Sequence, residues 1–410
     1  MTARRAHPRP TRAGLVLAVL AVTAGFAAPA AAAGPAAPTP ALAADLRADL
    51  EQYLQGRGAA EHVSAAAVSV SFRDRPETVD VSAGTTAFGG SVPVSPDALW
   101  QIGGNTQAMT SVLLLQLEAE GRLSIDDPVG RWLPEYPQWA DVSLRHLLSM
   151  TSGIPTYDDA PDFLADYAAH PLREFSREEL LGYAAALPAT SGYSYSNTDY
   201  VLAELVVERV TGTGYAAQLS ARLLGPLGLR DTYYRSHRYP PGIADRQPAG
   251  YYSRTTQPEL AALVGQDVSR YSLSWARGAG GVVSTTADMT LWARLLYDGW
   301  LLPPQQMAEL LSLVSTATGE PIEATSPDDP RGFGLGVAQL TDALGTSWSY
   351  EGQTLGFRFL HAYFPESGLI VAMGLNSSPD EDRIGDLATA VYDTLHTHGL
   401  VGPAPVGAAA

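Results

Sequence analysis

Two segments near the C-terminus alternate with a period of two residues, and this pattern constrains the fold more than any other feature of the chain. Residues 357–364 and 369–375 are rich in β-branched and aromatic side chains, which favour strands. The tetrapeptide 365–368, Pro-Glu-Ser-Gly, lies between them and has the composition of a tight turn. We therefore expect two neighbouring strands here, joined by that turn.

The other end of the chain also has strand patterns, whereas the middle is helical. Strands are expected at 63–72 and near 78–83, and a helix with a strong apolar face at 107–120. Further helices are expected at 41–53, 180–186, 200–210 and 386–395. Proline and glycine interrupt the helical, loop-rich stretch 125–270. This order predicts an α/β fold with an antiparallel sheet built from both chain ends, flanked by helices and carrying an inserted, mainly helical region.

The N-terminus has the pattern of a secretory signal peptide. Four arginines and no acidic residue precede an apolar run at 13–26, and small residues follow at 27–33. A membrane anchor is the alternative, but the apolar run is short for a span. We expect a signal peptide at 1–33, an Ala/Pro linker at 34–40, one domain at 41–398 and a flexible tail at 399–410, and hence a secreted, extracellular protein.

Composition narrows the possible partners. The 410-residue chain contains no cysteine, which excludes disulfides and thiol catalysis. Its formal net charge is −17, and loss of the four signal arginines leaves 22 basic against 43 acidic residues, a net charge of −21. We therefore expect no nucleic-acid partner and no membrane partner after signal cleavage. All 26 basic residues are arginine, so the chain has no lysine.

Seven short segments carry motifs that recur together in one known family. They are residues 99–117, 121–134, 147–155, 195–200, 279–289, 332–336 and 352–357. In this order they resemble the serine β-lactamase and penicillin-binding-protein family, which includes class C β-lactamases, DD-peptidases and esterases. The resemblance extends from about residue 41 to 398, and it implies the β-lactamase/transpeptidase-like fold.

The family's catalytic motifs are degenerate in this chain. The resemblance implies a Ser-x-x-Lys pair at the start of a helix, a Tyr-x-Asn motif and a Lys/His-x-Gly strand motif. The serine position is Gly104 and the lysine position is Gln107. Tyr350 replaces the basic residue of the third motif, whereas Tyr195 and Asn197 match the second. Glycine is not a nucleophile and glutamine is not a base, so acyl transfer by the family mechanism is not expected.

Other side chains are poor substitutes for the missing groups. Thr106 lies about 200° around the helix from the serine position, and Ser111 about two turns along it. Ser152 and Ser196 lie in segments that resemble the family, and the resemblance implies a structural role for both. The eight histidines are scattered, apart from His396 and His398, so no metal or other cofactor is expected.

The resemblance nevertheless implies a ligand pocket. Backbone N–H groups survive side-chain replacement, so an oxyanion hole is expected from Gly104 and Gln353. For Glu351, two interpretations remain open: its carboxylate repels an acidic ligand, or it points to solvent. The candidate ligand-binding residues are Gly104, Gln107, Asn197, Gly352 and Gln353, and any remaining catalysis is assigned to Tyr195, Tyr350 and Glu351.

Three functions are consistent with this pattern. The first is a non-catalytic relative, or pseudoenzyme, that binds a small molecule or peptide in the inherited pocket. The second is a repurposed enzyme that uses Tyr195, Tyr350 and Glu351 for acid–base chemistry. The third is an active serine hydrolase of the D-Ala-D-Ala carboxypeptidase, esterase or β-lactamase type. The missing motif residues favour the first.

Overall fold

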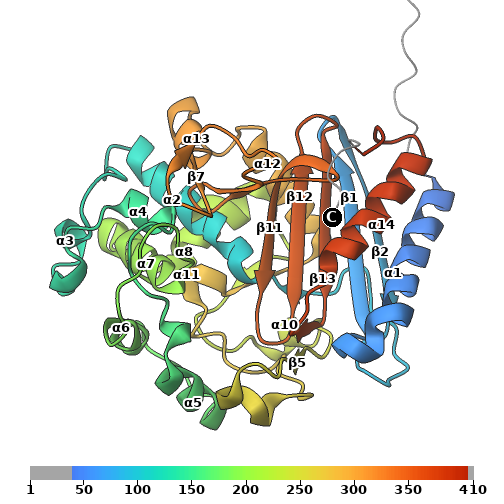
Figure 1. Cartoon of the computed structure of the whole chain (residues 1–410), viewed down its shortest axis with the longest axis horizontal. Helices are drawn as coiled ribbons and strands as arrows, with labels where there is room; N and C mark the ends of the chain where they lie inside the picture. The colour runs from blue at the N-terminus through green and yellow to red at the C-terminus, as the bar shows by residue number, and fades with distance from the viewer. Residues whose placement is uncertain (1–38, 405–410) are drawn as a thin grey trace, which may run out of the picture. The chain divides into compact units, whose positions relative to one another are not determined.

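The computed structural model describes residues 39–404 (Figure 1). The predicted signal peptide, residues 34–38 of the predicted linker and residues 405–410 of the predicted tail lie outside the described residues. Within the described part of the chain, no helix is both long and apolar enough to cross a membrane. The last helix ends at Thr397, and two residues of the predicted tail, Leu400 and Val401, are buried.

A nine-stranded antiparallel sheet forms the centre of the described region, in the order β2-β1-β13-β12-β11-β10-β9-β7-β8. Its strands are β1 (Ala65–Phe72), β2 (Arg75–Gly84), β7 (Leu313–Ser315), β8 (Pro321–Ile322), β9 (Arg331–Phe333), β10 (Ala338–Asp342), β11 (Gly345–Gln353), β12 (Arg358–Phe364) and β13 (Leu369–Leu375). Two small sheets accompany it, β14 (Ser377–Pro379) with β5 (Tyr251–Ser253), and β3 (Trp100–Gln101) with β6 (Val282–Ser284) and β4 (Tyr233–Tyr234).

The sheet joins the two ends of the domain as the sequence predicted. Strands β12 and β13 pair from Phe364 opposite Leu369, so the predicted strand pair is correct to within one residue. Strand β1 then pairs with β13, with Val68 opposite Met373. The blue and red strands lie side by side in Figure 1. The predicted α/β class with an antiparallel sheet and flanking helices is confirmed.

Each face of this sheet packs on helices because its strands alternate their side chains. On one face, Val68 and neighbouring strand residues share a core with α1 (Pro40–Glu61) and α14 (Ile384–Thr397). On the other face, Ala67 belongs to the larger core, which includes residues of α2 (Thr106–Ala119) and α12 (Thr286–Tyr297). Figure 1 shows α1 and α14 together beside the sheet.

Helices and turns dominate the segment between the strands of the two chain ends. In chain order they are η1 (Gly103–Asn105), α3 (Val129–Trp132), η2 (Pro137–Trp139), α4 (Leu144–Leu148), η3 (Tyr157–Asp159), α5 (Pro161–Ala169), α6 (Arg177–Ala185), α7 (Asn197–Thr211), α8 (Tyr215–Leu219), the π-helical turn η4 (Ser220–Leu224), α9 (Gly225–Leu227), α10 (Pro241–Ala244), η5 (Pro258–Leu263), α11 (Arg277–Gly280) and α13 (Pro304–Leu310).

Candidate functional site

The serine position lies in a crowded turn before α2. Gly104 belongs to η1 and is buried. A Cβ built on it would lie 2.8 Å from Tyr350 Cε1, 3.2 Å from Tyr350 Oη and 3.4 Å from Tyr195 Oη. Real Cβ atoms hardly ever approach another atom within 3.0 Å, so the Tyr350 ring takes up the space that a side chain at residue 104 requires.

Aromatic packing holds Tyr350 in this position. Its ring lies 5.7 Å from the ring of Phe333 on β9, and Phe333 lies 5.4 Å from Tyr193. Such contacts favour tilted arrangements and fix the ring orientation. At the position where the resemblance implies a basic residue, the Tyr350 ring therefore fills the space in front of Gly104.

A chain of hydrogen bonds links the remaining motif side chains in one direction. Tyr350 Oη donates to Gln107 Oε1 at 2.8 Å, and Gln107 Nε2 donates to Tyr195 Oη at 2.9 Å. Tyr195 Oη donates to Asn197 Oδ1 at 2.9 Å, and Asn197 Nδ2 donates to Asp158 Oδ2 at 3.0 Å. The structure thus brings together the four predicted motif side chains and adds Asp158, which the sequence analysis missed.

The charges around this chain disfavour a tyrosinate base. Burial raises the pKa of Tyr195, and the neighbouring Asp158 raises it further. Burial also raises the pKa of Tyr350 well above its usual value. Although residue Tyr195 is 41% exposed, its hydroxyl is hydrogen-bonded to Gln107 and Asn197. Gln107 stands at the lysine position and brings no positive charge, so both phenols stay neutral near pH 7.

Two close backbone approaches place the end of β11 against η1. A Cβ on Gly352 would lie 2.0 Å from Ile102 O and 2.8 Å from Gly104 N. A Cβ on Gly103, whose φ is +50°, would lie 2.6 Å from Gln353 N. Only glycine permits such approaches. The two backbone segments that were predicted to supply the oxyanion hole therefore lie side by side.

Glu351 lies in the pocket wall and is held by its neighbours. Gln353 Nε2 donates to Glu351 Oε1 at 2.6 Å and to Asp382 Oδ2 at 2.8 Å. Burial, with the hydrogen bond and charge of Asp382, raises the pKa of Glu351 to about 8. Burial opposes ionisation of Asp382 too, but its hydrogen bond with Glu351 and the charge of Arg358 hold its pKa below the usual value.

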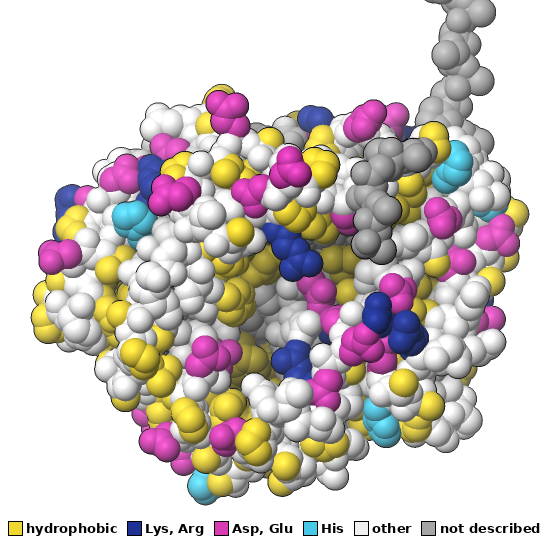
Figure 2. Space-filling model, viewed as in Figure 1, with side chains coloured by type: hydrophobic (Ala, Val, Ile, Leu, Met, Phe, Trp, Pro, Cys, Tyr) yellow, Lys and Arg dark blue, Asp and Glu magenta, His cyan; other side chains and the backbone are white. Residues whose placement is uncertain are grey.

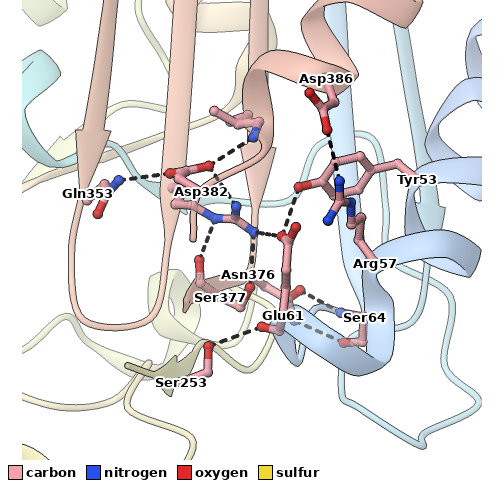
Figure 3. A network of polar contacts seen from close by, with 12 residues as sticks. Tyr53, Arg57, Glu61, Ser64, Ser253, Gln353, Asn376, Ser377, Asp382 and Asp386 are labelled. Carbon is pink, nitrogen blue, oxygen red and sulfur yellow. Dashed lines mark hydrogen bonds and ion pairs between the residues drawn. The ribbon is translucent and has the colours of Figure 1, made fainter. Parts of the chain in front are cut away.

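A buried arginine anchors the carboxylate beside Glu351. Arg358 on β12 is fully buried and contacts Asp382 Oδ1 at 2.8 Å and Glu61 Oε2 at 2.6 Å. Its Nε also donates to Ser377 O at 2.9 Å. Figure 3 shows Glu61 at the end of α1 reaching toward this network, and Asp382 reaching toward Gln353. The pocket wall is thus tied to α1 through Glu61, and to α14 because Ile384 N donates to Asp382 Oδ1 at 2.9 Å.

The end of β11 borders a pocket of about 420 Å³. Figure 2 shows a hollow in this face, with hydrophobic side chains and both basic and acidic side chains around it. Predicted site residues in its lining are Tyr195, Asn197, Glu351 and Gln353. Lining residues that the sequence analysis missed include Asp158, Phe163, Tyr167, Tyr252, Arg254, Leu260, Trp275 and Leu355. These residues belong to no recognisable motif. They come from segments that are far apart in the sequence, and only the fold brings them to the pocket.

The hydroxyls considered as substitutes make structural contacts. Thr106 is buried and its Oγ1 accepts from Val282 N at 3.3 Å. Ser111 Oγ lies 3.4 Å from Tyr200 Oη. Ser152 donates to both oxygens of the Asp199 carboxylate, and Ser196 caps the N-terminus of α7.

The histidines of the described region do not form a metal-binding cluster. Within residues 39–404, no group of three or more His, Asp or Glu side chains is placed to hold a metal ion. His396 Nδ1 lies 3.2 Å from Val401 O, and His398 Nε2 lies 2.8 Å from Asp45 Oδ2. Both contacts belong to the packing of the chain ends.

The fold, together with motifs that follow one another in the family's order, defines a protein of the serine β-lactamase and penicillin-binding-protein class. The family model described as Beta-lactamase matches residues 50–394, and the chain belongs to this family. At the motif positions that were predicted from the sequence, the described site has Tyr195 and Asn197, which match the second motif, and Gly104, Gln107 and Tyr350, which differ from the expected residues.

Named relatives in this family include enzymes. Esterase EstB of Burkholderia gladioli is 33% identical over 331 residues, covering 74% of this chain and 83% of the esterase. Penicillin-binding protein 4* of Bacillus subtilis is 28% identical over 274 residues, or 65% of this chain, and the match spans 58% of that protein's length.

Solved structures agree on the fold. A D-stereospecific amidohydrolase from Streptomyces sp. superposes with a TM-score of 0.71 at 27% identity, covering 85% of this chain and 97% of that one. The D-amino acid amidase of Ochrobactrum anthropi SV3 reaches a TM-score of 0.72 at 22% identity, covering 87% and 99% of the two chains.

Proposed function

We propose that this protein is a secreted, non-catalytic member of the family that binds a small molecule or peptide in the inherited pocket. The single observation that carries the proposal is the Tyr350 ring, which lies where a side chain at residue 104 would stand. The neutral chain from Tyr350 through Gln107 to Tyr195 supports it, because nothing in that chain can activate a nucleophile. Secretion rests on the pattern of residues 1–33.

Labelling with a fluorescent penicillin tests this function. The native chain is expected to form no covalent adduct. The matched positive control is the variant Gly104→Ser/Gln107→Lys/Tyr350→His, which restores the three motif positions and is expected to gain labelling. Gly104→Ser alone is expected to stay unlabelled, because Tyr350 still fills the space and no base is present. Labelling of the native chain that one hydroxyl substitution abolishes would overturn the proposal.

Glu351 favours a second function, acid–base catalysis without a covalent intermediate. It lines the pocket, and burial beside Asp382 raises its pKa to about 8, so it can exchange a proton near neutral pH. Tyr195 and Tyr350 fit this role less well, since their raised pKa values keep both phenols protonated near neutral pH and make them weak acids. If a reaction is found, Glu351→Gln is expected to lower kcat at least tenfold, and an unchanged kcat would exclude Glu351.

A further inference from the structure

A second pocket, of about 650 Å³, lies outside the candidate site and has a basic lining; we call it the Arg235 pocket. It shares no lining residue with the pocket beside the end of β11. Among the described residues, its charged lining consists of Arg235, Arg238, Arg270 and Asp245, and His237 also borders it. Arg270 pairs with Asp245 at 3.1 Å, so two arginines remain in excess. The pocket is therefore positively charged in a chain whose formal net charge is −17.

The two arginines in excess have no protein partner in the described part of the chain. Arg235 and Arg238 are both exposed, and neither guanidinium makes a hydrogen bond or an ion pair with residues 39–404. The local sequence explains this, because residues 232–244 contain two arginines, one histidine and no acidic residue. Each guanidinium therefore keeps its five N–H donors for water or for a bound ligand.

The loop that carries these arginines is held by its own polar contacts. Tyr239 Oη lies 2.6 Å from Gly281 O and accepts from Arg235 N at 3.2 Å. His237 Nδ1 lies 2.9 Å from Oγ of the buried Ser272. A loop that is already ordered loses less conformational entropy on binding an anion than a flexible segment does.

A buried amide adds a further donor to the pocket wall. Gln247 lines the pocket and is only 6% exposed. Its Oε1 accepts from Gln101 Nε2 at 3.3 Å, whereas its Nε2 has no hydrogen-bond partner within residues 39–404. Tyr271 and Leu273 add apolar surface to the same wall. The pocket thus combines convergent donors with room for an organic group beside an anion.

We propose that the Arg235 pocket binds a soluble phosphate monoester, with Arg235 and Arg238 pairing to the phosphate and the rest of the wall contacting its organic group. Two free guanidinium groups match the three terminal oxygens of a phosphate better than the two of a carboxylate, because each presents a planar fork of donors. The negative net charge of the chain opposes binding to an anionic membrane, which favours a soluble ester. This site is separate from the pocket of the proposed function and does not depend on it.

Titration calorimetry with phenyl phosphate and phenyl sulfate at pH 7.5 tests this recognition. The two compounds have nearly the same shape, but the phosphate carries close to two negative charges and the sulfate carries one. The native chain is expected to bind phenyl phosphate at least about tenfold more tightly than phenyl sulfate. Inorganic phosphate is expected to bind more weakly than the ester, because it lacks the organic group.

Two double variants separate the proposed pair from the overall charge of the chain. Arg235→Gln/Arg238→Gln is expected to weaken phenyl phosphate binding at least about tenfold. Its unfolding in urea is expected to match that of the native chain, because neither guanidinium has a protein partner. The matched control is Arg131→Gln/Arg209→Gln, which removes two arginines whose side chains are 60% and 47% exposed and lie outside this lining. The control is expected to bind the ester as the native chain does.

Four results would overturn the proposal. Equal weakening by both double variants would mean that only the overall charge matters, and unchanged binding by Arg235→Gln/Arg238→Gln would place the ester elsewhere on the molecule. Phenyl sulfate binding as tight as that of phenyl phosphate would exclude a phosphate site. Absence of phenyl phosphate binding at low-millimolar concentration also contradicts the proposal, and binding to phosphatidic acid vesicles in that case would assign the arginines to a lipid surface instead.

Discussion

At the scale of single residues, Gly104 and Tyr350 constrain each other. The 2.8 Å approach of a built Cβ to Tyr350 Cε1 means that residue 104 stays small as long as the ring stays in place. The Tyr350 hydroxyl in turn donates a hydrogen bond to Oε1 of Gln107, which stands at the expected lysine position. Replacement of the three motif residues is therefore one connected change in packing and hydrogen bonding.

A double-mutant cycle measures this constraint. Gly104→Ala is expected to lower the free energy of unfolding by about 1–3 kcal/mol through overpacking. In a Tyr350→Ala background, the same change is expected to cost nothing, because the ring is gone. Urea unfolding provides the measurement. The control is Gly182→Ala on α6, where a Cβ meets nothing within 4 Å and a small gain in stability is expected. An equal cost of Gly104→Ala in both backgrounds would contradict the account.

The pKa of Glu351 predicts a pH dependence of stability. In the unfolded chain this carboxyl titrates near pH 4.3, whereas in the folded chain its pKa is about 8. Between these values the folded state holds the additional proton, so the free energy of unfolding falls as pH rises. Asp382 has a lowered pKa, so its own contribution changes only below this window.

Glu351→Gln is expected to remove this decrease in the free energy of unfolding with rising pH. At pH 8.5 the variant is expected to be more stable than the native chain by about 1–3 kcal/mol. Thermal and urea unfolding between pH 5 and 9 measure the difference. The exposed Glu366→Gln, in the turn between β12 and β13, is the control and should follow the native curve. A Glu351→Gln curve parallel to the native one would mean that Glu351 is ionised throughout.

At the scale of elements, β11 connects the pocket to the scaffold. Its last residues, Glu351 to Gln353, face η1 on one side and Asp382 on the other. Asp382 is held by Arg358 of β12, which also reaches Glu61 at the end of α1. Distant parts of the sequence thus fix the pocket wall together.

Arg358→Met tests this connection. Removing the guanidinium leaves the carboxylates of Glu61 and Asp382 without their buried partner, which is expected to cost about 3–5 kcal/mol. Arg131→Met, which breaks an ion pair whose arginine is exposed, should cost less than about 1 kcal/mol. Urea unfolding of the two variants compares them, and equal costs would exclude a supporting role for Arg358.

Strand length and composition explain which elements the sequence predicted. Strands β12 and β13 have seven residues each, nearly all of them buried, and both were predicted to within one residue. Strands β7 to β9 have two or three residues each, too few for a strand composition to appear. Within the site, Gly104 and Tyr350 followed from the order of the motifs. Arg254 did not, because nothing in its local sequence indicates that β5 lies beside β11's end.

At the scale of the whole molecule, the fold does not depend on the residues at the expected serine and lysine positions. Its stability comes from two apolar cores, one on each face of the sheet, and neither includes a residue at the serine or lysine position. The residues at the expected serine and lysine positions are therefore not part of what stabilises the fold. A chain with other residues at these two positions can keep the family's fold.

Intact mass spectrometry after incubation with a fluorophosphonate tests the central claim most directly, because this reagent reports any activated hydroxyl. The account predicts that the purified native chain keeps its mass unchanged, while the variant Gly104→Ser/Gln107→Lys/Tyr350→His gains one adduct at residue 104. A stable adduct on the native chain, mapped by peptide analysis to a serine or threonine, would contradict the account and identify the residue that has replaced the lost nucleophile.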